Sequence, residues 1–189
     1  MPENTAGAPA QNWNTALKYI AGRKAAEENL GFVAHVSATV RDTKDAADVL
    51  PAVARTCVPF FATAISLDAG PTGGQAVVQA PDELNTIVQT LRELAVETGQ
   101  PQLVISEHEK FAKKTDPRHL ELLREGNGDS AVVLSLDYRG LSGGHLVLVR
   151  AEKHRRGAFS PSDLALASEV ADRVGAFNAL AGLTAPAGQ

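Results

Sequence analysis

The chain has 189 residues, of which 44% are hydrophobic and 21% are charged, and this average composition excludes wholesale disorder. Its 18 lysines and arginines against 22 aspartates and glutamates give a net charge of −4, which argues against nucleic-acid binding because that needs clustered positive charge. The apolar runs fall short of the ~18 residues that span a bilayer, and the first residues lack a signal peptide, so we expect a cytoplasmic protein with no membrane partner.

The first part of the chain is predicted to be helical. Apolar residues three and four positions apart predict a helical segment over 13–40, in which Gly22 and Gly31 would allow a break. Asp45 or Thr43 would cap a second helix that runs to about Val58. Residues 1–12 and 184–189 are interpreted as disordered tails, because they are short terminal segments rich in Ala, Gly and Pro.

The rest of the chain alternates between strands and helices. Alternating apolar residues predict five strands, at 62–67, 75–80, 102–106, 130–138 and 143–150. Two helices are predicted at 83–97, capped by Asp82, and around 119–124. Ser160 is a good N-cap for a last helix that runs to about Leu183, with Pro161 at its first position and Asp163 at its third.

This order of elements predicts an α+β fold. Most strands follow one another as hairpins, and turn-forming residues separate the first pair at Asp68–Gly74 and the last pair at "RGLSGG". We expect an antiparallel sheet with the terminal helices on one face and the middle excursion of the chain over the other.

From Leu30 to Leu183 the sequence resembles a GAF domain, the small-molecule sensor fold related to PAS. Three strings carry the resemblance: "DAADVLPAVARTCVPFFATAISL", "LRELAVETGQPQLVIS" and "GDSAVVLSLDYRGLSGGHLVLVRAEKHRRGAFSPSDLALASEVADRVGAFNAL". The last is similar to the closing hairpin and helix of GAF domains in actinobacterial regulators, often attached to stage-II-sporulation-type phosphatases or histidine kinases. The resemblance implies a GAF domain over 41–183, preceded by the helical segment 13–40.

The sequence departs from the family at the motifs that hold particular ligands. Of the Asn-Lys and Phe-x-x-x-Asp-Glu pattern of nucleotide-binding members, Phe159 and Asp163 match, Leu164 stands in place of the Glu, and Lys153 matches only with a shift. Cys57, the single cysteine, falls on an early helix and has no counterpart among the bilin-attaching cysteines. Its being alone also excludes an intrachain disulfide and the family's sulfoxide-reductase chemistry.

The fold implies a ligand pocket beneath a lid at His108–Leu123. Strand alternation puts Ser130, Val132 and Leu134 on one mainly apolar face, which we expect to face that lid. The candidate ligand-binding residues are Ile65, Leu67, Val104, Ser106, His108, Leu120, Leu123, Ser130, Val132 and Leu134. A fully packed core with no ligand would give the same pattern, so this alternative stays open.

Other chemistry-bearing residues form weaker patterns. The five histidines have no metal-binding spacing, so no metal is predicted and no cofactor is evident, although a haem with one axial histidine or another chromophore stays open. Ser130 and Ser106 lack a nucleophile motif, so no catalytic residue is predicted and an enzyme is not expected. A basic cluster at 150–156 could bind a phosphate or polyanion, but we favour a solvated hairpin exit in which Lys153 pairs with Asp163.

Two functions follow from this interpretation. The first is a sensory and regulatory domain that binds a small molecule and signals through its terminal helices to a regulatory protein partner. The second is a GAF domain without a ligand, which acts as a dimerisation or protein-docking module. The resemblance also implies a homodimer, because the paired terminal helices of GAF domains commonly form a parallel bundle between two subunits. Apolar stripes on the helices at 13–40 and 161–183 that are wider than one sheet face can cover would be buried in that bundle, and packing of these helices on their own sheet is the alternative.

Overall fold

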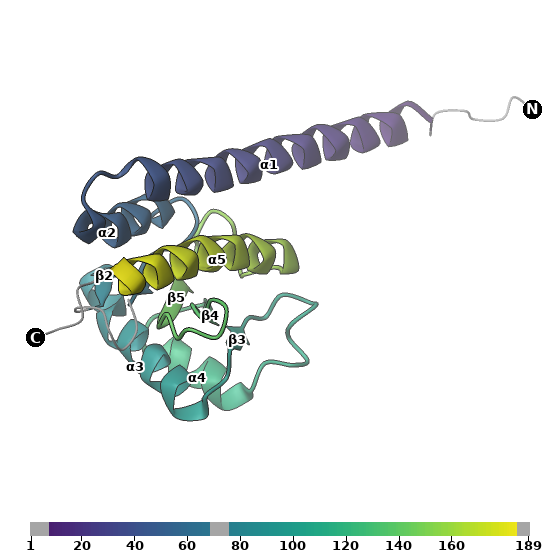
Figure 1. Ribbon diagram of the computed structural model, residues 1–189. Helices are drawn as coiled ribbons and strands as arrows, with labels where there is room; N and C mark the ends of the chain where they lie inside the picture. Colours follow the sequence, from purple (N-terminus) through teal and green to yellow (C-terminus); the bar gives the residue numbers. More distant parts are fainter. Residues whose placement is uncertain (1–7, 69–75, 185–189) are drawn as a thin grey trace, which may run out of the picture.

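The computed structural model describes residues 8–68 and 76–184. Its centre is a five-stranded sheet in the order β2-β1-β5-β4-β3, in which every neighbouring pair is antiparallel (Figure 1). The strands are β1 (Ala64–Leu67), β2 (Val77–Gln79), β3 (Gln102–Ile105), β4 (Ser130–Ser135) and β5 (His145–Arg150). The predicted α+β class and the predicted hairpins are therefore confirmed.

Helices cover both faces of the sheet. On one face lie α1 (Ala8–Asp42), α2 (Ala46–Cys57) and α5 (Pro161–Thr184), and on the other lie α3 (Asp82–Thr98) and α4 (Pro117–Glu125) (Figure 1). The strands alternate between these layers, so that Leu148 packs toward the terminal helices while Val147 and Val149 pack toward α3 and α4. The terminal helices and the middle excursion thus take opposite faces, as the sequence predicted.

Several element boundaries differ from the prediction. α1 runs unbroken through Gly22 and Gly31 and begins at Ala8, inside the segment that we expected to be a tail. A helical glycine costs only about 1 kcal/mol relative to alanine, which a long helix tolerates. The N-cap of α3 is Pro81, with Asp82 in the first turn, so the capping role predicted for Asp82 is wrong. Residues 1–7, 185–189 and most of the predicted turn at Asp68–Gly74 lie outside the described residues.

The first half of α1 projects from the body of the protein. Every residue of 12–27 is exposed, whereas the following part of α1 lies alongside α5 (Figure 1). The two helices run parallel, because Asn29 accepts a hydrogen bond of 2.8 Å from Arg156, ahead of α5, and Ser37 accepts one of 2.6 Å from Arg173, within α5. Over the described ranges, no helix combines the length and apolarity needed to cross a membrane.

A fully buried arginine holds the terminal-helix layer to the end of the sheet. Arg150, the last residue of β5, is 0% exposed, and its guanidinium lies 3.9 Å from the centre of the Phe159 ring. It donates to the carbonyl of Phe61 at 2.9 Å and to that of Gly157 at 3.1 Å. Its two terminal nitrogens donate to both oxygens of Asp163, at 3.0 and 3.1 Å. One side chain therefore joins β5, the segment after α2 and the start of α5.

Asp163 serves this ion pair and the N-terminus of α5 together. Its carboxylate accepts from the backbone N–H of Ser160 at 3.0 Å, and its own N–H donates to Ser160 Oγ at 3.2 Å, a reciprocal capping box. Burial would raise the pKa of Asp163, but hydrogen bonds and charge from Arg150, with the bonds from Ser160, lower the pKa to about 2. The predicted pairing with Lys153 is wrong: within the described chain the ion-pair partners of Asp163 are Arg150 and Arg156, and Lys153 is exposed.

We expect Asp163→Asn to lower the free energy of unfolding by about 3–5 kcal/mol, because it leaves the buried Arg150 charge uncompensated. The control Glu27→Gln, which breaks an exposed i,i+4 ion pair on α1, should change it by no more than about 0.5 kcal/mol. Urea unfolding followed by circular dichroism measures both.

The same pair predicts a pH dependence. Because the folded-state pKa of Asp163 is depressed to about 2, its stabilisation is present above the unfolded value and is lost as pH falls from about 4 toward 2. Asp163→Asn should flatten that part of the stability profile. If the free energy of unfolding of the variant fell as steeply as that of the wild type over this pH range, the role of Asp163 would be contradicted.

Candidate ligand site

Four of the predicted pocket residues face the terminal helices rather than the lid. Ile65 and Leu67 on β1, and Val132 and Leu134 on β4, all belong to the core beneath α1, α2 and α5. The alternation along β4 was predicted correctly, but the face that we assigned to the lid is wrong. Both faces of Ser130–Leu134 are buried, so apolar content could not tell which layer covers which face.

Ser106 and Ser130 are brought together at one backbone segment. Both are 0% exposed. Ser106 Oγ donates to the carbonyl of Phe159 at 2.7 Å, and the N–H of Phe159 donates to Ser130 Oγ at 3.1 Å. The N–H of His108 in turn donates to Ser106 Oγ at 3.1 Å. The connection between β3 and α4 is thereby tied to the segment that leads into α5.

The remaining predicted residues are distributed over both layers. Val104 packs against the terminal-helix core, whereas Leu120 and Leu123 of α4 pack on the α3 side of the sheet. The half-buried ring of His108 lies 6.2 Å from that of Phe111, and its Nδ1 accepts from the N–H of Lys110 at 3.3 Å. The ten predicted residues therefore do not line one cavity.

The layer beneath α3 and α4 is closely packed around two glycines. A Cβ at Gly126 would come within 2.5 Å of the Ile87 side chain, and one at Gly128 within 2.4 Å of Leu123 and 3.1 Å of Val149. The loop between α4 and β4 can approach α3 and the sheet this closely only because both positions lack a side chain. This loop forms one wall of the hollow described next.

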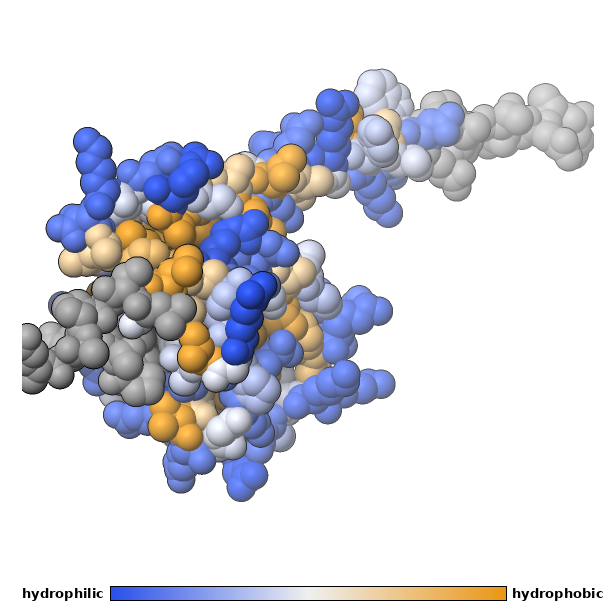
Figure 2. Space-filling view, in the orientation of Figure 1, coloured by the Kyte–Doolittle hydropathy of each residue, from blue (hydrophilic) through white to orange (hydrophobic). Residues whose placement is uncertain are grey.

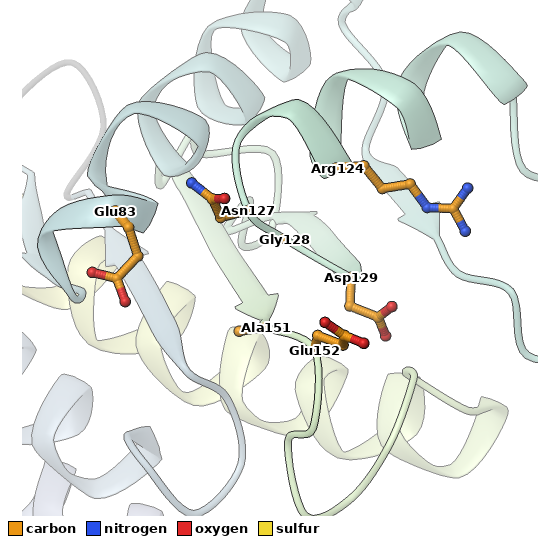
Figure 3. Close-up of a pocket in the computed structure, with 7 residues that line it drawn as sticks. All are labelled: Glu83, Arg124, Asn127, Gly128, Asp129, Ala151 and Glu152. Carbon is orange, nitrogen blue, oxygen red and sulfur yellow. The ribbon is translucent and has the colours of Figure 1, made fainter.

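A hollow of about 620 Å³ opens at the edge of the α3 and α4 layer, where β4 begins and β5 has ended (Figure 3). Its lining comes from the first turn of α3, the end of α4, the loop before β4 and the residues after β5: Glu83, Arg124, Asn127, Gly128, Asp129, Ala151 and Glu152. In the sequence, the signal of this site is the polar string "GNGD" at 126–129, between the end of a helix and an apolar strand.

The lining of this hollow is negatively charged. Glu83, Asp129 and Glu152 contribute three carboxylates, and those of Asp129 and Glu152 lie near each other in Figure 3. The guanidinium of Arg124 pairs with Glu107, which is not one of the lining residues, at 2.6 Å. The hollow therefore favours ligands that carry positive charge or hydrogen-bond donors, since like charges repel.

One buried hydroxyl in the same layer has no partner. Ser66 on β1 is 1% exposed, and its Oγ makes no hydrogen bond within the described chain. It lies between Ile65 and Leu67, which face the terminal helices, and opposite Val147, so it faces α3. An unsatisfied buried hydroxyl costs about 1–3 kcal/mol, and Ser66 is not one of the residues that line the hollow.

The thiol of the single cysteine is enclosed in the core. Cys57 is 0% exposed in the terminal-helix core, and burial raises the pKa of its thiol to about 12, so the reactive thiolate does not form near neutral pH. Over residues 8–68 and 76–184, no three His, Cys, Asp or Glu side chains gather as a potential metal site.

Comparison with known proteins identifies the fold. No protein-family model and no curated protein matches the chain. Among solved structures, a phycocyanobilin-bound GAF domain from a cyanobacterial phytochrome matches with 16% identity and a TM-score of 0.54, over 84% of this chain and 97% of that one. GAF domains of phosphoenolpyruvate-protein phosphotransferases match as well. The one from Acinetobacter matches with 14% identity and a TM-score of 0.56, over 84% of this chain and 97% of that one. The one from Coxiella burnetii matches with 20% identity and a TM-score of 0.55, over 82% of this chain and 95% of that one. The chain has the GAF fold, as the sequence resemblance implied.

We expect Gly128→Ala to lower the free energy of unfolding by about 1–3 kcal/mol, because its Cβ would overpack Leu123 and Val149. Gly22→Ala is the control, since nothing lies within 4 Å of its added Cβ and an exposed helical position should gain up to about 1 kcal/mol. Urea midpoints compare the two. Equal stability of Gly128→Ala and the wild type would show that the loop can move away from the sheet.

Proposed function

We propose that this chain is a sensory domain that binds a small molecule in the hollow beside α3 and α4. The observation that carries this proposal is the hollow itself, whose volume of about 620 Å³ falls in the range of small-molecule sites. The bilin in the phytochrome GAF domain of the same fold supports it, although covalent attachment to this chain would find no accessible thiol within the described residues. The cytoplasmic location stays a prediction from the sequence.

The ligand is expected to be a cation or a neutral molecule rich in hydrogen-bond donors. Three carboxylates line the hollow, and its arginine is directed to Glu107. An anion such as a nucleotide would meet like charge there. A metabolite panel should therefore begin with amines, amino alcohols and sugars.

The signal would pass to α5 through Ser106 and Ser130, which both form hydrogen bonds with the backbone of Phe159. Ser106 follows β3, Ser130 begins β4, and Phe159 lies two residues before Pro161, the first residue of α5. A ligand that shifts these strand ends would displace the start of α5, and α1 would follow because it is bonded to Arg156 and Arg173. A regulatory protein that contacts the terminal helices could detect this change.

A bound ligand at a concentration 100-fold above its dissociation constant should stabilise the chain by about 2.7 kcal/mol, measured as a thermal shift. Asp129→Asn with Glu152→Gln should abolish the shift. Glu93→Gln with Glu97→Gln, which removes the same charge from exposed positions of α3, should preserve it. Without ligand, Ser66→Ala should unfold at a higher urea concentration, because it removes an unsatisfied hydroxyl. No shift with the panel or with the small-molecule fraction of a cell extract would contradict ligand binding.

Dimerisation is a second candidate function, favoured by the projecting part of α1. Trp13, Leu17, Tyr19 and Ile20 are 71%, 57%, 71% and 61% exposed, and hydrophobic surface is visible on the projecting helix (Figure 2). Trp13, Leu17 and Ile20 are spaced by four and three residues, the pattern of a coiled-coil seam. A helix without tertiary support is marginal in water, so we propose that α1 pairs with α1 of a second copy.

Leu17→Glu with Ile20→Glu should convert a dimer into a monomer by light scattering, because charges replace the apolar seam. The control Val96→Glu alters an apolar residue on α3 that is 64% exposed and should leave the mass unchanged. A wild-type chain that is monomeric at high protein concentration would contradict the dimer. A stable dimer without any ligand-induced shift would favour dimerisation as the main function.

A further inference from the structure

Phe60 separates two hollows on the terminal-helix side of the molecule. One, of about 270 Å³, lies between α1 and α2 and is lined by Glu28, Phe32, His35, Thr56 and Phe60. The other, of about 510 Å³, is lined by Pro59, Phe60, Lys153, His154 and Arg155. Because both include Phe60, they adjoin along one half-buried aromatic ring. Phe60 is itself fixed, with its ring centre 5.3 Å from that of Phe32 in the core.

The rim of the larger hollow carries the outward half of the basic cluster. Arg150 and Arg156 turn inward to Asp163, which leaves Lys153 and Arg155 exposed. The guanidinium of Arg155 lies 4.8 Å from the centre of the Phe60 ring and 3.5 Å from Glu28. Lys153 forms no ion pair within the described part of the chain. Two cations thus border the Phe60 ring. Within the described chain Lys153 has no carboxylate partner, and Arg155 has only the long, exposed pair with Glu28.

The backbone that presents these cations is held in place. Lys153 has a left-handed conformation with φ of 67°, and the ring of His154 is hydrogen-bonded on both sides, to the carbonyl of Pro59 at 3.1 Å and from the N–H of Arg156 at 3.3 Å. One nitrogen donates and the other accepts, which defines a neutral imidazole. Burial lowers the pKa of His154, and the charges of Arg150, Arg156 and Arg155 lower it further. The positive charge at the rim therefore comes from Lys153 and Arg155.

We propose that the larger hollow, the one lined by Pro59, Phe60 and residues 153–155, is a second binding site. This Phe60 hollow would take a small organic anion with an apolar body, such as an aryl or acyl carboxylate or phosphate. The apolar body packs on Phe60, and the anionic group contacts Lys153 and Arg155. The larger hollow has the volume of a small-molecule site. A nucleic acid is disfavoured by the net charge of −4 and by the single aromatic surface, since stacking of successive bases needs several.

This site differs in charge from the one beside α3 and α4. The turn after β5 separates the two sites. Glu152 lines the hollow beside α3 and α4, the acidic hollow, and the next residue, Lys153, lines the Phe60 hollow. The proposal goes beyond the proposed function, because an anion would bind here whether or not the acidic hollow takes a ligand.

Three probes of equal size test the charge preference: phenylbutyrate, phenylbutanamide and phenylbutylamine. Each is titrated into the isotope-labelled chain and followed by amide chemical shifts. We expect phenylbutyrate to shift the resonances of 59–60 and 153–156, to bind about three- to tenfold more tightly than the amide, and to weaken at high salt. The amine should bind more weakly than the amide.

Paired variants locate the effect. Lys153→Asn with Arg155→Gln should reduce the affinity for phenylbutyrate to that of the amide, and asparagine tolerates the left-handed backbone at 153. Lys113→Asn with Lys114→Gln removes two exposed charges from the loop between β3 and α4 and should leave the affinity unchanged, as should the Asp129→Asn and Glu152→Gln pair. Equal binding of the three probes, or unchanged binding in the Lys153 and Arg155 variant, would overturn the proposal. Binding of a leucine- and glutamate-rich peptide in place of phenylbutyrate would overturn it in favour of a protein-docking surface.

Discussion

The buried pair of Arg150 and Asp163 determines how the terminal helices meet the sheet. An arginine at the end of β5 can be fully buried only because the carbonyls of Phe61 and Gly157 and both oxygens of Asp163 accept its hydrogen bonds. Lysine could not replace it, since the flat guanidinium serves several acceptors at fixed angles and also stacks on Phe159. Removal of one partner of such a buried pair is costly, because it leaves the other charge uncompensated in the interior. The pair fixes the N-terminus of α5 against β5, and Arg156 extends the same network to Asn29 of α1.

The two faces of the sheet are stabilised differently. The terminal-helix face combines its apolar core with this ionic network and with Asn178, which bonds the carbonyls of Asp68 and Gly143. The other face depends on close apolar packing of α3, Leu123 and the sheet, and it includes the unpartnered Ser66. Directional bonds define one arrangement, whereas apolar contacts allow small displacements at lower cost. In the proposed function, the α3 and α4 face would be the one that adjusts to a ligand, and the bonds of Ser106 and Ser130 to Phe159 would carry the adjustment toward α5.

The sequence was sufficient for the fold and insufficient for the site. Alternation predicted the five described strands, and the capping preference of serine predicted Ser160 at the start of the last helix, because these patterns depend on neighbours along the chain. The face of the sheet that Val132 occupies depends instead on which helices cover it, and both faces of β4 are apolar. The partner of Asp163 was missed for a similar reason. Lys153 and Arg150 are both close to Asp163 in the sequence, but only Arg150 lies on β5 with its side chain in the core. The acidic hollow gathers residues from Glu83 to Glu152, which no local spacing connects.

The turn after β5 links these features. Ala151 and Glu152 border the acidic hollow, Lys153 to Arg155 border the Phe60 hollow, and Arg156 and Gly157 bond to Asp163 and Arg150. The turn is short and internally bonded, from the N–H of His154 to the carbonyl of Ala151 and from that of Gly157 to the carbonyl of His154. One peptide bond, between Glu152 and Lys153, therefore separates the linings of the two hollows. Any effect of an occupant of one hollow on the affinity of the second must be reciprocal, and both would act on the same readout, because the turn leads directly into the residues that hold α5 and α1.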